Sequence, residues 1–468
     1  MICYCKKAVG IAMCLAAQAI TGTVYAQQQP TFTLGQLTDA ATHHLPAILQ
    51  KQALVNSAKA NVTDARHTAL PALKLSDQVV MGTANGTTGT ALPIGVTVST
   101  SSGIRTDNLS NVASGNIATL YGEYELVNFG LRKARVQNAL VNEQLTETDL
   151  SKDIYLLKLQ VSKLYFTMLR NLYRLGIDQQ NISRYKAVYN VIHAITKSGI
   201  RAGVDSSLAL AELSRAQISY DRKMGEIKQL QQQMAFLTGI TDSIRIDTSE
   251  KRYDVALSPA AWSTTADTIQ NPLISYFRKQ KELYQATDNL IKKSYLPKIL
   301  LAGGIWGRGT SIDYADNYNY KALSNGLGYQ RFNYAAGVAL TYNLFDLVHR
   351  KDKLAVNNYN IQASNYGLEQ QQQALNTALQ QAQTAINTAE LNLQNLPVQL
   401  QAATAAYDQK LAQYRAGIIN LVDLTNASFV LYQAQTDYVE VLNDWMQANL
   451  DKAAATGNLD LFIQSIKN

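Results

Sequence analysis

The five histidines are the side chains best suited to bind a metal or transfer a proton, yet none has a companion at metal-site or catalytic-triad spacing. The sequence also lacks a phosphate-binding glycine loop, a Gly-x-Ser-x-Gly turn and a paired-carboxylate signature. We therefore predict that the protein is not an enzyme and that it holds no metal and no cofactor. The histidines are His43, His44, His67, His193 and His349.

Cysteine chemistry is excluded by where the three cysteines lie. Residues 1–26 have the pattern of a secretory signal peptide, with the basic pair Lys6 and Lys7, an apolar stretch and a small-residue cleavage site that ends at Ala26. All three cysteines fall inside this segment, so the mature chain is predicted to contain no thiol. They are Cys3, Cys5 and Cys14.

The composition limits the classes of partner. The chain has 468 residues, of which 47% are hydrophobic and only 16% are charged, so it is not disordered, and neutral polar residues replace charge on its surfaces. Loss of Lys6 and Lys7 with the signal lowers the formal net charge of +7 to +5, too weak and scattered to indicate nucleic-acid binding. After the signal, no run reaches the roughly 18 apolar residues of a transmembrane helix. Contact with a membrane would therefore be made by strands.

Four short motifs occur twice, in the same order, and indicate an internal repeat. We expect the first repeat to cover 27–247 and the second 248–468. The paired motifs are Leu45-Pro46 with Asn271-Pro272, Leu70-Pro71 with Leu296-Pro297, Leu126–Gly130 with Tyr342–Asp346, and Arg201–Gly203 with Arg415–Gly417.

Each repeat is predicted to contain two strands, which makes four in the chain. Alternation of apolar and polar residues places them at 72–82, 116–128, 298–307 and 332–344, with 298–307 alternating poorly. Strands of about ten residues with one apolar and one polar face are typical of transmembrane barrels, although a soluble half-buried sheet has the same pattern. The last strand presents the clearest apolar face, which we expect to contact lipid. Its large members are Phe332, Tyr334, Val338, Leu340 and Tyr342.

Each repeat should also contain a short helix, one very long helix and a returning helix. Apolar residues at steps of three and four, from Leu375 to Tyr414, predict a coiled-coil seam in the second long helix. Pro397 lies inside this helix and predicts a kink. We expect the shorter helices to stack end to end along the long ones. The helices are 35–67, 131–198 and 204–238 in the first repeat and 264–294, 346–416 and 418–456 in the second.

The ordered motifs resemble those of the TolC-like outer-membrane efflux family, over the whole mature chain. They include Asn271-Pro272-Leu273, Leu296-Pro297, Asn343-Leu344-Phe345-Asp346, and Tyr414-x-x-Gly417 before Leu421-Val422-Asp423-Leu424. The resemblance implies a mixed α+β membrane protein in the outer membrane, extending into the periplasm. It implies a homotrimer whose twelve strands, four per chain, form one shared β-barrel that continues into an α-helical coiled-coil tunnel. Three copies would also remove the open sheet edges that lipid does not tolerate.

The resemblance implies two kinds of site in the helical part. The turns containing Arg201 with Gly203 and Arg415 with Gly417 would dock a periplasmic adaptor protein, although a glycine helix cap with a favourable nearby cation explains the same residues. The acidic constriction of the family corresponds to Asp423, whereas Asn426 departs from the second acidic position. Three Asp423 carboxylates would favour cations, but an acid in the first turn of a helix is also stabilised by the helix dipole.

The function implied is an exit duct of a tripartite efflux pump, which passively conducts small molecules from an inner-membrane transporter through the adaptor. Two alternatives stay open at this point. The same duct would serve type I protein secretion or metal-ion export, and a periplasmic coiled-coil scaffold with a small soluble sheet would share the helical pattern. Lipid contact by the strand at 332–344 separates the duct from the scaffold.

Overall fold

The computed structural model of the chain consists of two compact units, each built from segments distant in sequence. The helical unit takes its residues from Met1–Leu45, Leu156–Ala266 and Ala378–Asn468, and the sheet unit from Pro46–Tyr155 and Asp267–Thr377. The structure describes residues 31–83, 110–198, 203–241, 244–246, 271–312 and 322–466. The predicted signal peptide at 1–26 lies outside these ranges.

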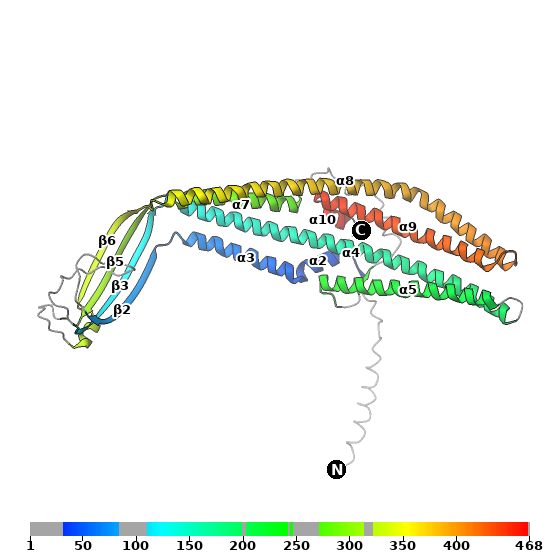
Figure 1. Ribbon diagram of the computed structural model, residues 1–468, viewed down its shortest axis with the longest axis horizontal. Helices are drawn as coiled ribbons and strands as arrows, with labels where there is room; N and C mark the ends of the chain where they lie inside the picture. The colour runs from blue at the N-terminus through cyan, green and yellow to red at the C-terminus, as the bar shows by residue number, and fades with distance from the viewer. Residues whose placement is uncertain are drawn as a thin grey trace, which may run out of the picture. The chain divides into compact units, whose positions relative to one another are not determined.

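Four antiparallel strands form the sheet of the sheet unit, in the order β2-β3-β5-β6 (Figure 1). All four predicted strands are confirmed, although β3 begins earlier than the alternation indicates and β6 ends before Tyr342. A bulge between Glu125 and Val127 shifts the β3–β5 register at the helix end of the sheet. The strands are β2 Ala72–Thr83, β3 Val112–Val127, β5 Lys298–Thr310 and β6 Arg331–Thr341.

A capping residue sets where α7 of the sheet unit begins. The side chain of Asn271 caps α7 (Pro272–Ser294) by accepting a hydrogen bond of 3.0 Å from the Leu273 amide, and Pro272 occupies a first-turn position that needs no donor. The predicted helix at 264–294 is therefore wrong at its start, because the backbone of Asn271 is extended at φ −61° and ψ 130° and α7 begins only at Pro272. Residues 264–270 lie outside the described ranges. The first 25 or so residues of α4 (Leu131–Lys197) and the first 32 or so of α8 (Asp346–Arg415) also belong to this unit.

The predicted helix at 35–67 is wrong in one respect, because it is two helices. α2 (Leu34–His44) and α3 (Pro46–His67) are separated at Leu45, whose backbone is extended at φ −62° and ψ 120°. Proline lacks an amide hydrogen and disfavours helical backbone in the residue before it, so Pro46 ends one helix and starts the next.

Both long helices are continuous over their predicted lengths. α8 runs unbroken through Pro397, and the kink at this proline stays a prediction, as does the end-to-end stacking of the shorter helices. The coiled-coil seam is confirmed in α8, since most of its predicted members are buried. These are Leu375, Ala382, Ile386, Ala389, Leu396, Ala403, Tyr407 and Tyr414.

The helical unit is completed by α5 (Gly203–Thr238), α9 (Leu421–Thr456) and α10 (Leu459–Ser465). Tyr165 and Phe166 of α4 are almost fully buried, and the Phe166 ring meets Phe462 of α10 at 6.1 Å between centroids. A short parallel pair of β1 (Thr31–Phe32) with β4 (Arg245–Ile246) joins distant segments of this unit. The sequence patterns predict neither α10 nor this pair.

Candidate functional site

The sheet has one apolar and one polar face, and the strand register shows which residues share each. Partners directly opposite in a ladder point to the same side. Tyr334 is opposite Ile305, Ile305 is opposite Leu120, and Leu120 is opposite Leu75. These residues therefore define the apolar face across all four strands. Its large members also include Leu73, Val79, Met81, Leu301, Phe332, Val338 and Leu340.

The apolar face is exposed to an extent that is unusual for such large side chains. Phe332 is 75% exposed, Tyr334 85% and Leu75 81%. From Phe332 to Leu340 the face extends about 26 Å at 3.3 Å per residue, comparable with the apolar band of about 25 Å on a membrane barrel. Four of the five residues predicted to contact lipid lie on this face, and Tyr342 follows the last residue of β6.

The polar face carries the alternate residues of the same strands. Near the helix end, Lys298 pairs with Glu125 at 3.3 Å between the ammonium nitrogen and a carboxylate oxygen. Near the loop end, Arg308 is directly opposite Arg331. Three of the β6 positions between these two levels on the polar face are small residues, Ala335, Gly337 and Ala339. The polar face also carries Lys74, Ser76, Gln78, Thr119, Tyr121, Glu123, Trp306 and Asn333.

A strap formed by residues 322–330 lies across the apolar face at the loop end of the sheet. The Asn116 side-chain amide donates to the carbonyl oxygen of Leu327 at 2.9 Å, and the Ser114 hydroxyl donates to that of Leu323. The Tyr329 hydroxyl donates to Asp77 on β2 at 2.9 Å. The strap therefore spans from the β6 edge to the β2 edge.

Glycines allow the strap to approach the sheet this closely. A Cβ at Gly309 would lie 1.7 Å from the carbonyl oxygen of Gly328, and one at Gly326 would lie 2.1 Å from the Ser114 hydroxyl oxygen. A larger residue at either position would push the strap away from the sheet. The sequence signal for this contact is the glycine spacing in 298–307 and just beyond, which also explains why that strand alternates poorly.

The turn between α8 and α9 closes with a Schellman motif. Gly417 has a left-handed φ of 74°, its amide donates to the Tyr414 carbonyl at 3.0 Å, and the Ile418 amide donates to the Gln413 carbonyl at 2.9 Å. Arg415 is the last residue of α8. These bonds satisfy carbonyls that the helix end leaves free, as the capping interpretation of this glycine predicts.

The corresponding turn between α4 and α5 differs. Gly203 is the first residue of α5 and its φ is not left-handed, so the capping interpretation is wrong for this glycine. Arg201 lies outside the described residues. The two glycines therefore take different positions, since Gly203 begins α5 and Gly417 follows the end of α8.

Asp423 and Asn426 lie in the first two turns of α9. The side chain of Asn420 caps this helix by accepting from the Asp423 amide at 2.9 Å. Asp423 is half-buried and Asn426 is exposed, whereas Leu421 and Leu424 on the other side of the helix are buried. The structure thus leaves the Asp423 carboxylate at the surface of the chain.

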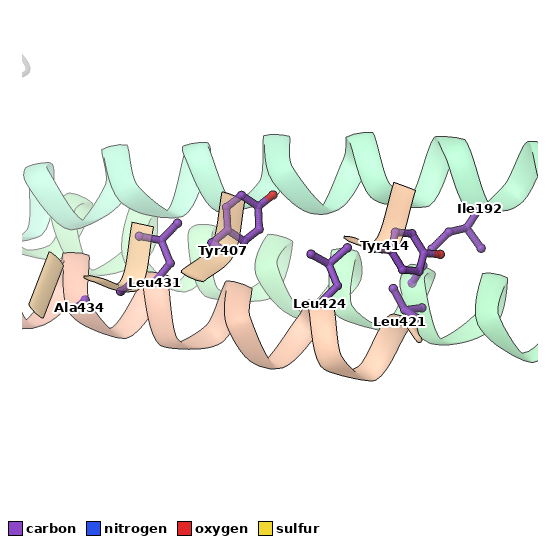
Figure 2. Packing of buried hydrophobic residues seen from close by; sticks show 9 residues of the cluster. Ile192, Tyr407, Tyr414, Leu421, Leu424, Leu431 and Ala434 are labelled. Carbon is purple, nitrogen blue, oxygen red and sulfur yellow. The ribbon is translucent and has the colours of Figure 1, made fainter. Parts of the chain in front are cut away.

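A hydrophobic core that includes Leu421 and Leu424 is formed by residues from four helices (Figure 2). Ile192 of α4, Ala209 of α5, Tyr407 of α8 and Leu424 of α9 all belong to it. Beside this core, the guanidinium of Arg184 donates to the side chains of Asn181 and Gln435, each at 3.2 Å. Burial raises the pKa of Tyr407 and lowers that of Arg184. The core includes Tyr414 and Leu421, so packed side chains support the α8–α9 turn from both of its helices.

The helices of the described ranges lack any segment that is both long and apolar enough to cross a membrane. The described histidines and carboxylates also form no group of three or more that could hold a metal ion.

A family model described as outer membrane efflux protein matches residues 37–240 and 271–458. The chain is similar in fold to a crystal structure of CusC, with a TM-score of 0.73 at 15% identity, covering 91% of this chain and 92% of that one. The Campylobacter jejuni CmeC outer membrane channel gives a TM-score of 0.71 at 15% identity, covering 91% and 86%. The open state of the Neisseria gonorrhoeae MtrE outer membrane channel gives 0.67 at 17% identity, covering 91% and 89%. A comparison with the sequences of curated proteins finds no significant match.

Proposed function

Because the chain belongs to the outer membrane efflux protein family, whose members are channels and not enzymes, we propose that three copies of it assemble into a passive exit duct. The duct conducts small molecules that an inner-membrane transporter delivers through a periplasmic adaptor. Membership in this family of outer-membrane channels argues against the periplasmic scaffold.

The observation that carries the proposal is a sheet that has an exposed apolar face and, among the described residues, two edges that pair with no further strand. β2 and β6 are the outer strands of the sheet, and β6 is exposed along its whole length. Lipid can solvate the apolar face, but no lipid group can satisfy the edge amides and carbonyls. Joining β6 of one copy to β2 of the next closes the sheet, and three copies give twelve strands. The polar face then lines the lumen.

The helical part supplies the two further roles in the proposal. The turn at Arg415 and Gly417 contacts the adaptor, because a rigid core supports it and it presents a cation next to exposed Ile418. Arg201 and Gly203 act in the equivalent turn of the first repeat. Asp423, with Asn426 one turn on, faces the trimer axis and forms a narrow cation-favouring ring.

The molar mass of the detergent-extracted protein tests the assembly. Light scattering with the detergent contribution subtracted should give three chains per particle, for protein extracted from outer membranes. A particle that contains one chain and stays soluble without detergent would overturn the duct. The apolar face would then need another partner.

A further inference from the structure

We propose that Arg308 and Arg331 form an anion-attracting site on the polar face at the loop end of the sheet, for solutes that carry carboxylate, sulfate or phosphate groups. The inference rests on the proposed function, because it takes the polar face as the lumen of the duct. This site is positively charged, whereas the ring proposed at Asp423 is negatively charged.

The two arginines are held side by side by the strand register. Arg308 of β5 and Arg331 of β6 are the last pair of their ladder, directly opposite each other. Like charges in this position repel and destabilise a sheet. A bound or locally concentrated anion would relieve that repulsion.

The strap fixes the side to which Arg308 points. Its neighbour Gly309 is on the apolar face, where the Gly328 carbonyl lies so close that a Cβ would be 1.7 Å away. Adjacent residues of a strand point to opposite faces, so Arg308 points away from the strap. Arg331 is exposed, and one of its guanidinium nitrogens donates to the Gln330 carbonyl at 3.0 Å.

No described carboxylate neutralises the pair. The β3 residue in line with Arg308 is Ile117. The nearest acid of β3 on the polar face is Glu123, about 20 Å further along the strand at 3.3 Å per residue, beyond the screening length of about 8 Å at physiological salt. Glu125 already pairs with Lys298. Among the described residues, neither arginine takes part in an ion pair.

Closure of the barrel would not supply a carboxylate from the adjoining strand. The strand placed beside β6 would be β2 of the next copy, and its polar-face residues include no acid. In whichever register the two strands pair, β2 therefore offers Arg331 no carboxylate, and three copies bring two arginines each to the same level of the lumen. The polar-face residues of β2 are Ala72, Lys74, Ser76, Gln78, Val80 and Gly82.

Trp306 provides a reporter beside the site, two residues from Arg308 on the same face of β5. We would reconstitute the full mature protein in lipid nanodiscs and measure quenching of tryptophan fluorescence by iodide and by neutral acrylamide. A Trp306→Phe variant gives the background from Trp262 and Trp445. Arg308→Gln with Arg331→Gln should lower the iodide quenching constant of Trp306 by about two- to threefold and leave the acrylamide constant unchanged, an effect that 1 M salt removes.

Lys74→Gln is the matched control, because it removes the same charge from the same face nearer the helix end of the sheet. It should change iodide quenching by less than Arg308→Gln alone. Sulfate should compete with iodide in the wild type and not in the double variant.

The outcomes separate this inference from the proposed function. Unchanged iodide quenching in the double variant, with normal acrylamide quenching, would overturn the anion site and leave the duct intact. Quenching of Trp306 by brominated lipid, with protection from acrylamide, would mean that the polar face is not a lumen, and both proposals would fail.

Discussion

Large apolar side chains are exposed on the sheet and buried near the α8–α9 turn. Tyr334 is 85% exposed and Phe332 75%, whereas Leu421 and Leu424 are 1% and 2% exposed. Burial of such a side chain contributes about 1.5 to 3 kcal/mol in water, so a sheet with this face would be unstable there. The two regions are therefore adapted to different surroundings: the outer surface of the sheet to lipid, and the outer surface of the helices to water.

The largest expected effect is on the apolar face. Val338→Arg should prevent assembly in the membrane, because an arginine facing lipid costs about 2 to 4 kcal/mol per copy near the middle of the bilayer. Ala339→Arg is the matched control, since its side chain lies on the polar face of the same strand. The measurement is the amount of trimer in isolated outer membranes. If both variants failed to form trimers in the outer membrane, or if both formed them normally, the assignment of lipid to one face of the sheet would be contradicted.

The second largest effect is expected on the stability of the hydrophobic core next to the α8–α9 turn. Leu424→Ala should destabilise the region around the turn by about 2 to 5 kcal/mol, because it leaves a cavity between α4, α8 and α9. Val422→Ala, at a side chain that is 51% exposed, should change stability by about 0.5 kcal/mol or less. Hydrogen exchange of the amides at 403–434 reports on this region alone. Equal protection in the two variants would show that the core does not support the turn.

We expect a smaller difference in stability between glycine substitutions in the α8–α9 turn and in the α4–α5 turn. Gly417→Ala should cost about 1 to 2 kcal/mol, because its φ of 74° is strained for any residue with a Cβ. Gly203→Ala should be neutral or stabilise by up to about 1 kcal/mol, because its φ is not left-handed and a Cβ there meets nothing within 4 Å. Thermal unfolding of the two variants checks this contrast. Equal losses would mean that the turns share one conformation.

The sequence predicts the long helices and the strands well because their periodicity is sustained. The seam from Leu375 to Tyr414 and the alternation in 332–341 each repeat one pattern many times. A single residue decides the boundary between α2 and α3, since Pro46 splits a helix that the apolar pattern alone would continue. The short elements α10, β1 and β4 carry too little periodicity to be predicted. The strap and the Arg308–Arg331 pair depend on strand register, and a sequence pattern does not specify which residues of β5 and β6 lie opposite.

The smallest expected effect concerns the proposed ring at Asp423. Asp423→Asn should lower the cation-to-anion permeability ratio in planar bilayers by about twofold, because it removes one charge per copy from a narrow ring. Stability should fall by only a few tenths of a kcal/mol, the contribution of an acid to the helix dipole. The Asp423→Asn variant keeps the backbone amide of residue 423, which donates to the capping side chain of Asn420. Asn420→Ala is the matched control, since it removes the cap at a cost of about 1 kcal/mol and keeps the carboxylate. If the constriction hypothesis is right, selectivity follows Asp423 and stability follows Asn420. If both variants keep the wild-type permeability ratio, Asp423 is only a first-turn acid and the narrowest part of the duct lies elsewhere.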